Sequence, residues 1–142
     1  MSVYVVVPVF NRLALTQSLV GCIRRQKLDQ PLQLCIVNDG STDGTAEWLA
    51  RQHDIEVLDG DGSLFWGGAI DLALRHLQKK AMPEDWVLLI NNDTTVTDDF
   101  VQRLLGAALA HAPAAVGSVI RDESDPARLL SIGARVDAWR LL

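Results

Sequence analysis

The chain has few of the features that mark secreted, membrane-spanning or metal-clustering proteins. Only two of its 142 residues are cysteines, Cys22 and Cys35, without a CxxC pair or a histidine at ligand spacing. Both lie inside apolar segments, which predicts two buried free thiols of a reduced, cytoplasmic protein. No apolar run reaches the roughly 18 residues that a membrane helix needs. The apolar N-terminal segment lacks a basic leader and is interrupted by Pro8 and Asn11, so it favours a strand over a signal peptide.

Positive charge is also scarce. The net charge is −5, and no cluster of Lys and Arg is longer than a pair. Without a basic stripe, recognition of a phosphate backbone has no electrostatic support, which excludes nucleic acid as a partner. Hydrophobic residues make up 49% and charged residues 22% of the chain, as in ordinary globular proteins. We expect one domain over residues 1–142, which would bury roughly 68–70% of its unfolded surface.

Apolar runs rich in β-branched residues alternate with segments of helical periodicity. The runs are continuous, as expected for parallel strands that are covered on both faces. Ser41 and Asp43 are N-cap candidates for the second expected helix. The alternation predicts the α/β class, a three-layer sandwich with a mostly parallel sheet. The expected strands cover residues 3–9, 32–37, 55–58, 86–90 and 115–120, and the expected helices cover 13–26, 45–52, 68–80 and 100–110.

Four successive expected strands end in polar, acidic or glycine-rich residues. Ligands of such sheets bind outside the carboxyl ends of the strands, so these four ends predict a polar ligand site at one edge. Asp39, at the tip of the second strand, could accept a hydrogen bond from a base N–H or a ribose hydroxyl. The four segments are 8–12, 38–45, 59–68 and 91–93.

Two familiar phosphate-binding motifs, GxGxxG and the P-loop, are absent. Gly67 and Gly68 instead precede an expected helix, where they would let the backbone approach a ligand and leave N–H groups free at the positive helix end. This arrangement predicts contact with a phosphate or another anion. Phe65 and Trp66, just before the glycines, fit either a stacking pair or the core.

The stretch "DWVLLINNDTTV" ends a buried strand on an oxygen-rich tip, Asn91-Asn92-Asp93. Hard divalent cations such as Mg²⁺ and Mn²⁺ prefer oxygen ligands, and they commonly keep waters and substrate phosphates as further ligands. The single carboxylate of Asp93 would suffice if a diphosphate supplied the remaining oxygens. A solvated strand-to-helix turn is the alternative interpretation of the same residues.

Five motifs together carry a resemblance to a known family. The chain resembles the N-terminal, donor-binding part of family 2 glycosyltransferases, which have the GT-A fold with its Rossmann-like nucleotide-binding half. The stretch "LFWGGA" is similar to that of bacterial rhamnosyltransferase-like members. The motifs run in the family's order and are "VVPVFNR" (6–12), "IVNDGSTDGT" (36–45), "GSLFWGGAIDLAL" (62–74), "LLINNDTTV" (88–96) and "SIGARVD" (131–137).

The resemblance implies roles for individual residues. The donor would be a UDP-, dTDP- or GDP-sugar, and the cofactor Mg²⁺ or Mn²⁺. The family's Asp-x-Asp element reads Asn91-Asn92-Asp93 here, which makes Asp93 the main metal ligand with Asn91 beside it. The implied nucleotide-binding residues are Pro8, Phe10, Arg12, Asp39 and Asn92, and the implied sugar and diphosphate contacts are Gly67, Gly68 and Asp71.

The implied activity is metal-dependent, inverting transfer of a sugar to an acceptor hydroxyl, in polysaccharide biosynthesis, by a cytoplasmic protein or one peripheral to the inner face of the membrane. In the family a carboxylate beyond the end of this chain acts as general base, so the chain is expected to stop before the acceptor-binding half. That would leave an unfilled sheet edge and favour self-association. Two alternatives remain open. One is an inactive nucleotide-binding or interaction module; the other, a sugar nucleotidyltransferase, should have a glycine-rich, basic first loop that "PVFNRLALTQ" lacks.

Overall fold

The computed structural model of the chain describes residues 1–113 and 115–132. They belong to two compact units, Met1–Val101 and Gln102–Leu142, which we describe separately. The expected single domain over the whole chain stays a prediction. Residues 133–137, the end of the last matching motif, lie outside the described residues.

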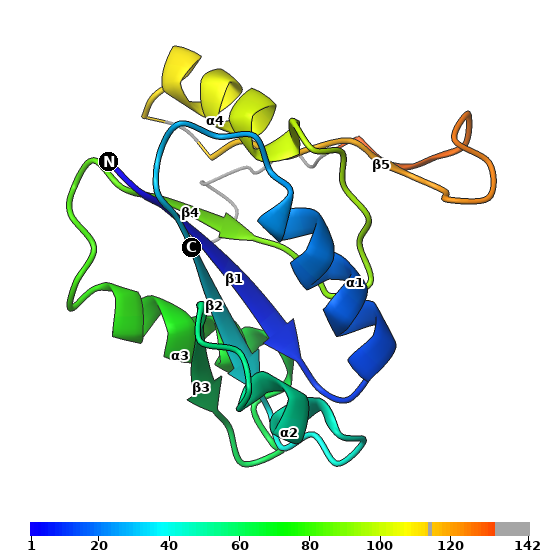
Figure 1. Cartoon of the computed structure of the whole chain (residues 1–142). Helices are drawn as coiled ribbons and strands as arrows, with labels where there is room; N and C mark the ends of the chain where they lie inside the picture. The colour runs from blue at the N-terminus through cyan, green and yellow to red at the C-terminus, as the bar shows by residue number, and fades with distance from the viewer. Residues whose placement is uncertain (114, 133–142) are drawn as a thin grey trace, which may run out of the picture. The chain divides into compact units, whose positions relative to one another are not determined.

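Strands and helices alternate throughout the first unit, and its four strands form one parallel sheet in the order β3-β2-β1-β4 (Figure 1). This confirms the predicted α/β class and parallel sheet. The elements are β1 (Val3–Val9), α1 (Leu13–Arg24), β2 (Leu32–Asn38), α2 (Thr45–Leu49), β3 (Ile55–Asp59), α3 (Phe65–Leu77) and β4 (Trp86–Leu89).

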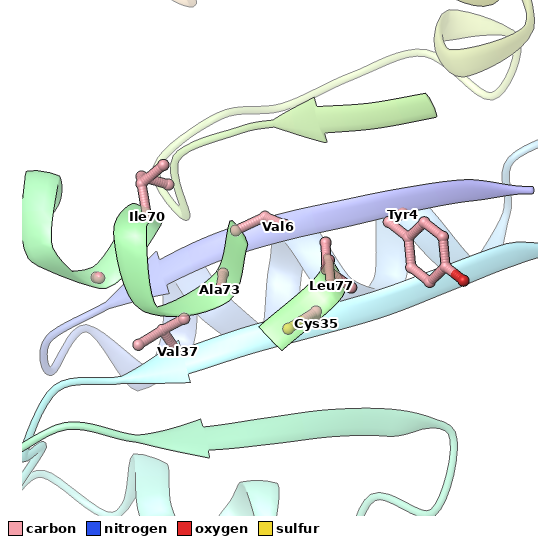
Figure 2. Packing of buried hydrophobic residues seen from close by; sticks show 8 residues of the cluster. Tyr4, Val6, Cys35, Val37, Ile70, Ala73 and Leu77 are labelled. Atoms are coloured by element: carbon pink, nitrogen blue, oxygen red, sulfur yellow. The ribbon is translucent and has the colours of Figure 1, made fainter. Parts of the chain in front are cut away.

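One face of the sheet packs against α3. Val6 on β1 and Val37 on β2 meet Ala73 in the middle of the helix, and Leu77 lies beside Cys35 (Figure 2). All of these side chains are buried. Alternate residues of a strand point to opposite faces, so this pattern accounts for every second residue of the two central strands.

The other face of the sheet packs against α1. Val5, Val7 and Ile36 alternate with the residues that face α3, and all three are fully buried. Helix α1 crosses this face (Figure 1) and buries Leu19 and Ile23 on its inner side. The result is a helix–sheet–helix sandwich, as the continuous apolar runs predict.

The strand β4 ends early, and Pro8 explains where. The N–H of Ile90 donates to the carbonyl of Val6 (3.1 Å), so Val6 faces β4. Pro8, two residues further along, faces the same way but has no N–H to continue the ladder. Residues 7–9 of β1 therefore run on beside β2 alone, and the chain after Leu89 turns out of the sheet.

Several predicted helix bounds were wrong, since α1 ends at Arg24 rather than at residue 26, α2 at Leu49 rather than at 52, and α3 at Leu77 rather than at 80. Helix α3 begins at Phe65 rather than at Gly68, because the carboxylate of Asp39 accepts the N–H groups of Leu64 and Phe65 at its start. The residue before α2 is Gly44, in the left-handed region (φ 94°), and not Ser41 or Asp43. Asp43 still accepts the N–H of Thr45 (3.1 Å) from one position further back.

The second unit contains most of α4 (Phe100–Ala110) and a short antiparallel hairpin of β5 (Ile120–Arg121) and β6 (Leu129–Ser131). The helix matches its predicted bounds, but the predicted strand over 115–120 was wrong, since only Ile120 belongs to a strand. The run contains Ala, Gly and Ser, which have low strand propensity. Val119 and Ile120 are also exposed, so burial does not compensate.

Both cysteines are buried and free, as predicted. Burial, with the nearby charge of Glu56, raises the pKa of Cys35 to about 11, so this thiol stays protonated at neutral pH. None of the helices in the described part of the chain has the length and apolar character needed to cross a membrane.

Glu56, on β3, ties the end of α3 to the sheet. Its carboxylate contacts His76 Nε2 (2.6 Å) and the ammonium of Lys80, which also lies 5.5 Å from the centre of the Tyr4 ring. Partial burial alone would raise the pKa of Glu56, but the hydrogen bonds from Lys80 and His76 bring it below the ordinary value. The ionised carboxylate therefore stabilises the folded state.

We expect Glu56→Gln to lower stability near neutral pH by about 0.5 to 1 kcal/mol, the usual scale of partly exposed ion pairs. A lowered folded-state pKa gives stability that is present above the unfolded pKa and is lost as the pH falls through the folded one. The difference between wild type and variant should therefore shrink between about pH 6 and about pH 3. Urea denaturation at each pH measures it, and a difference that stays constant with pH would contradict this role.

Leu77 should be a large contributor to the core on the α3 face, because its side chain is 2% exposed. We expect Leu77→Ala to cost about 2 to 5 kcal/mol of unfolding free energy through lost burial and the cavity left behind. Leu15→Ala, at an exposed position of α1, is the matched control and should cost less than about 1 kcal/mol. Equal losses in chemical denaturation would show that the cluster in Figure 2 is not the packed core.

Candidate functional site

A pocket of about 350 Å³ lies in the first unit, at the carboxyl ends of β1, β2 and β4. It lies where β4 has left the sheet and the end of β1 is uncovered on that side. Most of the residues predicted for the site meet here. The lining residues are Pro8, Val9, Phe10, Arg12, Asp39, Gly62, Phe65, Trp66, Ala69, Asn91, Asn92 and Asp93.

The turn after β1 carries Arg12 into the pocket in an uncommon backbone conformation. Asn11 and Arg12 both have positive φ angles, 59° and 64°, a region that non-glycine residues seldom adopt. The loop after β2 holds them there. Ser41 Oγ accepts the N–H of Asn11 (2.8 Å), Asn11 Oδ1 accepts the N–H of Thr42 (2.8 Å), and an Asp43 oxygen accepts the N–H of Leu13 (2.9 Å).

Asp39, the first residue after β2, has a buried carboxylate that accepts three backbone N–H groups. Its Oδ1 accepts from Gly62 (2.8 Å), and its Oδ2 accepts from Leu64 (3.0 Å) and Phe65 (3.1 Å). The residue is only 5% exposed. No acidic residue lies in the first turn of α3. Asp39, at the end of β2, supplies the negative charge that stabilises this helix N-terminus.

The loop before α3 can approach Asp39 this closely only because of its glycines. A Cβ on Gly60 would lie 2.5 Å from Asp39 Oδ1, and Gly62 has a φ of 90°, which an L side chain rarely adopts. The predicted glycines, Gly67 and Gly68, lie inside the first turn of α3 and do not line the pocket. The N–H of Gly68 bonds to the carbonyl of Leu64 (3.0 Å), so it is not free for a phosphate.

Three aromatic side chains line the pocket and remain largely in solvent. Phe10 is 58% exposed, Phe65 82% and Trp66 54%. Phe65 also has a positive φ of 52°, and the hydrogen bond to Asp39 fixes it there. Trp66 Nε1 donates to Asn91 Oδ1 (2.9 Å). Of the two interpretations of Phe65 and Trp66, the core is therefore excluded.

The three polar residues that follow β4 make different contacts. Asn92 is buried, and its Nδ2 donates to the hydroxyl of Thr16 on α1 (3.1 Å). Asn91 bonds to Trp66, as described above. Asp93 is about half exposed and forms an ion pair with Arg12, with 3.0 Å between Asp93 Oδ2 and Arg12 Nη1.

The oxygens of Asp93 and Asn91 fit part of a divalent-cation shell, because both are hard ligands and both side chains line the pocket. They do not form a complete site alone. Among residues 1–113 and 115–132, no three side chains of His, Cys, Asp or Glu gather where they could hold a metal. Asp71, predicted to contact the sugar, does not line the pocket and pairs with Arg75 along α3 (2.7 Å).

Sequence reasoning missed several contributors. Val9, Gly62 and Ala69 line the pocket and lie within the family motifs, but an apolar strand end, a loop glycine and a small helical residue carry no chemical signal that would assign each a role. Thr16 was missed for a different reason. It lies on the buried face of α1, and only the folded structure shows that its hydroxyl meets the chain after β4.

Comparison with known proteins identifies the class of protein to which this fold and pocket belong. The sequence profile of Glycosyl transferase family 2 matches residues 4–132. The chain therefore belongs to glycosyltransferase family 2. No curated protein matches it at a significant level.

Solved structures of GT-A glycosyltransferases share the fold. The mannosyltransferase PcManGT from Pyrobaculum calidifontis, in complex with GDP-Man and Mn²⁺, aligns with a TM-score of 0.65 and 25% identity over 87% of this chain and 36% of its own. S. aureus TarS 1–349 in complex with UDP-GlcNAc aligns with a TM-score of 0.62 and 23% identity over 78% of this chain and 32% of its own. The chain thus spans about a third of the length of these solved relatives.

Asp39→Asn should destabilise the first unit, because an amide NH₂ would replace one of the two oxygens that face backbone N–H donors. We expect a loss of about 2 to 3 kcal/mol, since hydrogen bonds to a charged group contribute about 1.5 to 3 kcal/mol. Asp71→Asn, at the exposed pair on α3, removes the same charge and should change stability by less than about 1 kcal/mol. Urea denaturation of both variants tests this, and a neutral Asp39→Asn would mean that its three bonds do not hold the loop.

Proposed function

We propose that this chain binds a nucleotide-sugar donor in the pocket and acts in metal-dependent, inverting transfer of the sugar to an acceptor hydroxyl. One observation carries the proposal. In a chain of this family, the pocket at the strand ends brings Arg12, Asp39 and Asp93 together with three exposed aromatic side chains. The complexes of solved relatives with UDP-GlcNAc and GDP-Man support a nucleotide-sugar as the ligand.

The nucleoside would lie at the Phe10 and Asp39 side of the pocket. An exposed aromatic ring in a pocket offers a face on which a base can stack. A carboxylate has about four lone-pair positions, and three backbone N–H groups already use three of the positions on Asp39. Asp39 would therefore act mainly by holding the loop at residues 60–65, with one position left for a base N–H. Pro8 contributes a rigid wall at the end of β1.

The diphosphate and cation would lie at the Asp93 side. Asp93, with Asn91 beside it, would hold Mg²⁺ or Mn²⁺, while phosphate oxygens and waters supply the other ligands. When bound, such a cation stabilises the charge that develops on the leaving nucleoside diphosphate. The Mn²⁺ in the complex of PcManGT supports this assignment. Asn92 contributes indirectly, since it anchors the chain beside Asp93 to Thr16.

Inversion follows if the acceptor hydroxyl attacks the anomeric carbon directly, on the face opposite the leaving group. Both carboxylates of the pocket have other roles, since Asp39 accepts three N–H groups and Asp93 would hold the cation. Neither is placed to accept the proton of the incoming hydroxyl. We therefore assign the general base to a carboxylate outside this pocket. Gly67, Gly68 and Asp71 would contribute to sugar binding only through the first turns of α3.

Because neither carboxylate of the pocket is left to act as base, a second candidate is a module that binds nucleotide without catalysing transfer by itself. Self-association is a further part of the proposal, supported by β4. This strand forms one end of the sheet and exposes Val87 and Leu89. A role in polysaccharide biosynthesis and a cytoplasmic or peripheral membrane location stay predictions.

Isothermal titration of UDP, dTDP and GDP, with and without Mn²⁺, tests the donor site. We expect one nucleotide to bind, and we expect omission of Mn²⁺ or the Asp93→Ala substitution to weaken its binding at least tenfold. Asp54→Ala, at an exposed acid outside the pocket, is the control for loss of one negative charge. If the folded wild type binds none of the three nucleotides, the proposed function is wrong. Glycosyl transfer or hydrolysis of the matching donor then separates an enzyme from a binding module.

A further inference from the structure

The ion pair between Arg12 and Asp93 is the starting point, because it joins the proposed metal ligand to a guanidinium of the same pocket. We propose that Arg12 is an internal counter-ion that occupies Asp93 in the donor-free protein and exchanges it for the diphosphate. Cation and nucleotide would then bind cooperatively. This inference rests on the proposed function and adds to it a mechanism that couples the two ligands.

The buried hydroxyl of Thr16 connects the two chain segments that carry Arg12 and Asp93. The carbonyl of Arg12 accepts both the N–H (3.0 Å) and the hydroxyl (3.1 Å) of Thr16. The same hydroxyl oxygen accepts from Nδ2 of Asn92 (3.1 Å), the residue before Asp93. Thr16 is fully buried. The backbone of Arg12 and the side chain of Asn92 are thus linked through one buried oxygen.

The charged groups themselves stay in solvent. The side chain of Arg12 is 58% exposed and that of Asp93 is 48% exposed. An exposed ion pair contributes little to stability and can exchange partners readily. Arg12 and Asp93 can therefore separate when a ligand binds, at little cost to stability, while the hydrogen bonds of Thr16 keep their two chain segments together.

Within the described part of the chain, the pocket offers no second exposed carboxylate, Arg or Lys. Among its lining residues, Arg12 is the only Lys or Arg, and Asp93 is the only carboxylate besides Asp39. Asp39 is committed to three backbone N–H groups. The pair joins Asp93 Oδ2 to Arg12 Nη1, so a cation at Asp93 either displaces Arg12 or binds the second oxygen with the guanidinium charge beside it. A diphosphate that binds the guanidinium draws Arg12 away from Asp93.

This competition makes the two ligands interdependent. When a cation binds Asp93 alone, the guanidinium of Arg12 either loses its ion pair or stays close to the positive ion, and both weaken the binding of the cation. With a diphosphate also present, Arg12 can form charge-assisted, bidentate hydrogen bonds to phosphate oxygens, so the pair is broken once for both ligands. By linkage, each ligand must raise the affinity for the other by the same factor. The inference assigns Arg12, one of the implied nucleotide-binding residues, to the diphosphate.

The test measures Mn²⁺ binding to the whole chain from the electron paramagnetic resonance signal of free Mn²⁺, with and without the nucleotide identified by titration. In Arg12→Gln we expect Mn²⁺ alone to bind up to about five times more tightly than in wild type, the scale of one exposed ion pair. The enhancement of Mn²⁺ binding by nucleotide should shrink. Arg75→Gln removes an equal charge from an exposed pair outside the pocket and should behave like wild type.

Two results would overturn the counter-ion role. If Arg12→Gln binds Mn²⁺ alone no more tightly than wild type and keeps the full enhancement by nucleotide, Arg12 does not guard Asp93, while the donor site itself stands. If Arg75→Gln tightens Mn²⁺ binding as much as Arg12→Gln, the effect is one of net charge. A wild type that binds neither Mn²⁺ nor nucleotide would instead reject the proposed function, and this inference with it.

Discussion

The carboxylate of Asp39 is the contact on which the site depends. A charge with only 5% exposure is costly unless hydrogen bonds compensate for lost water, and here three backbone N–H groups do so. These bonds place the glycine-rich loop against the end of β2, start α3 at Phe65 and turn the Phe65 and Trp66 side chains toward solvent. One residue at a strand tip thereby determines where a helix begins and which aromatic rings line the pocket.

The rest of the site is built on the same plan, in which loops after different strands bond to one another. The turn after β1 is fastened to the loop after β2 through Asn11, Ser41 and Asp43. The exit of β4 is fastened to α1 through Thr16. Loops are usually the mobile parts of a fold, but these are cross-linked at their bases. The exposed side chains of Arg12 and Asp93, which bond to each other, are assigned to the diphosphate and the cation.

The sequence predicted the fold well because its signals are local. Long apolar runs and helical periodicity identify β1, α1, β2 and α4 almost to the residue, and the family resemblance implies a role for seven of the twelve pocket residues. The start of α3 could not be predicted, because it depends on Asp39, more than twenty residues away. The pairing of Arg12 with Asp93 spans 81 residues. The strand predicted at 115–120 failed because apolar composition alone does not show whether a segment will be buried.

Pro8 carries a consequence that concerns protein engineering. The space beside residues 7–9 of β1 exists because a residue without an N–H faces β4 and the ladder stops there. The pocket is therefore an incompletely paired region of the sheet, and the chain forgoes backbone hydrogen bonds to keep it open. Substitutions that raise strand propensity or add a donor at this point would gain stability by extending β4 across the opening. Selection for thermal stability and selection for ligand binding should thus act in opposite directions at this one position.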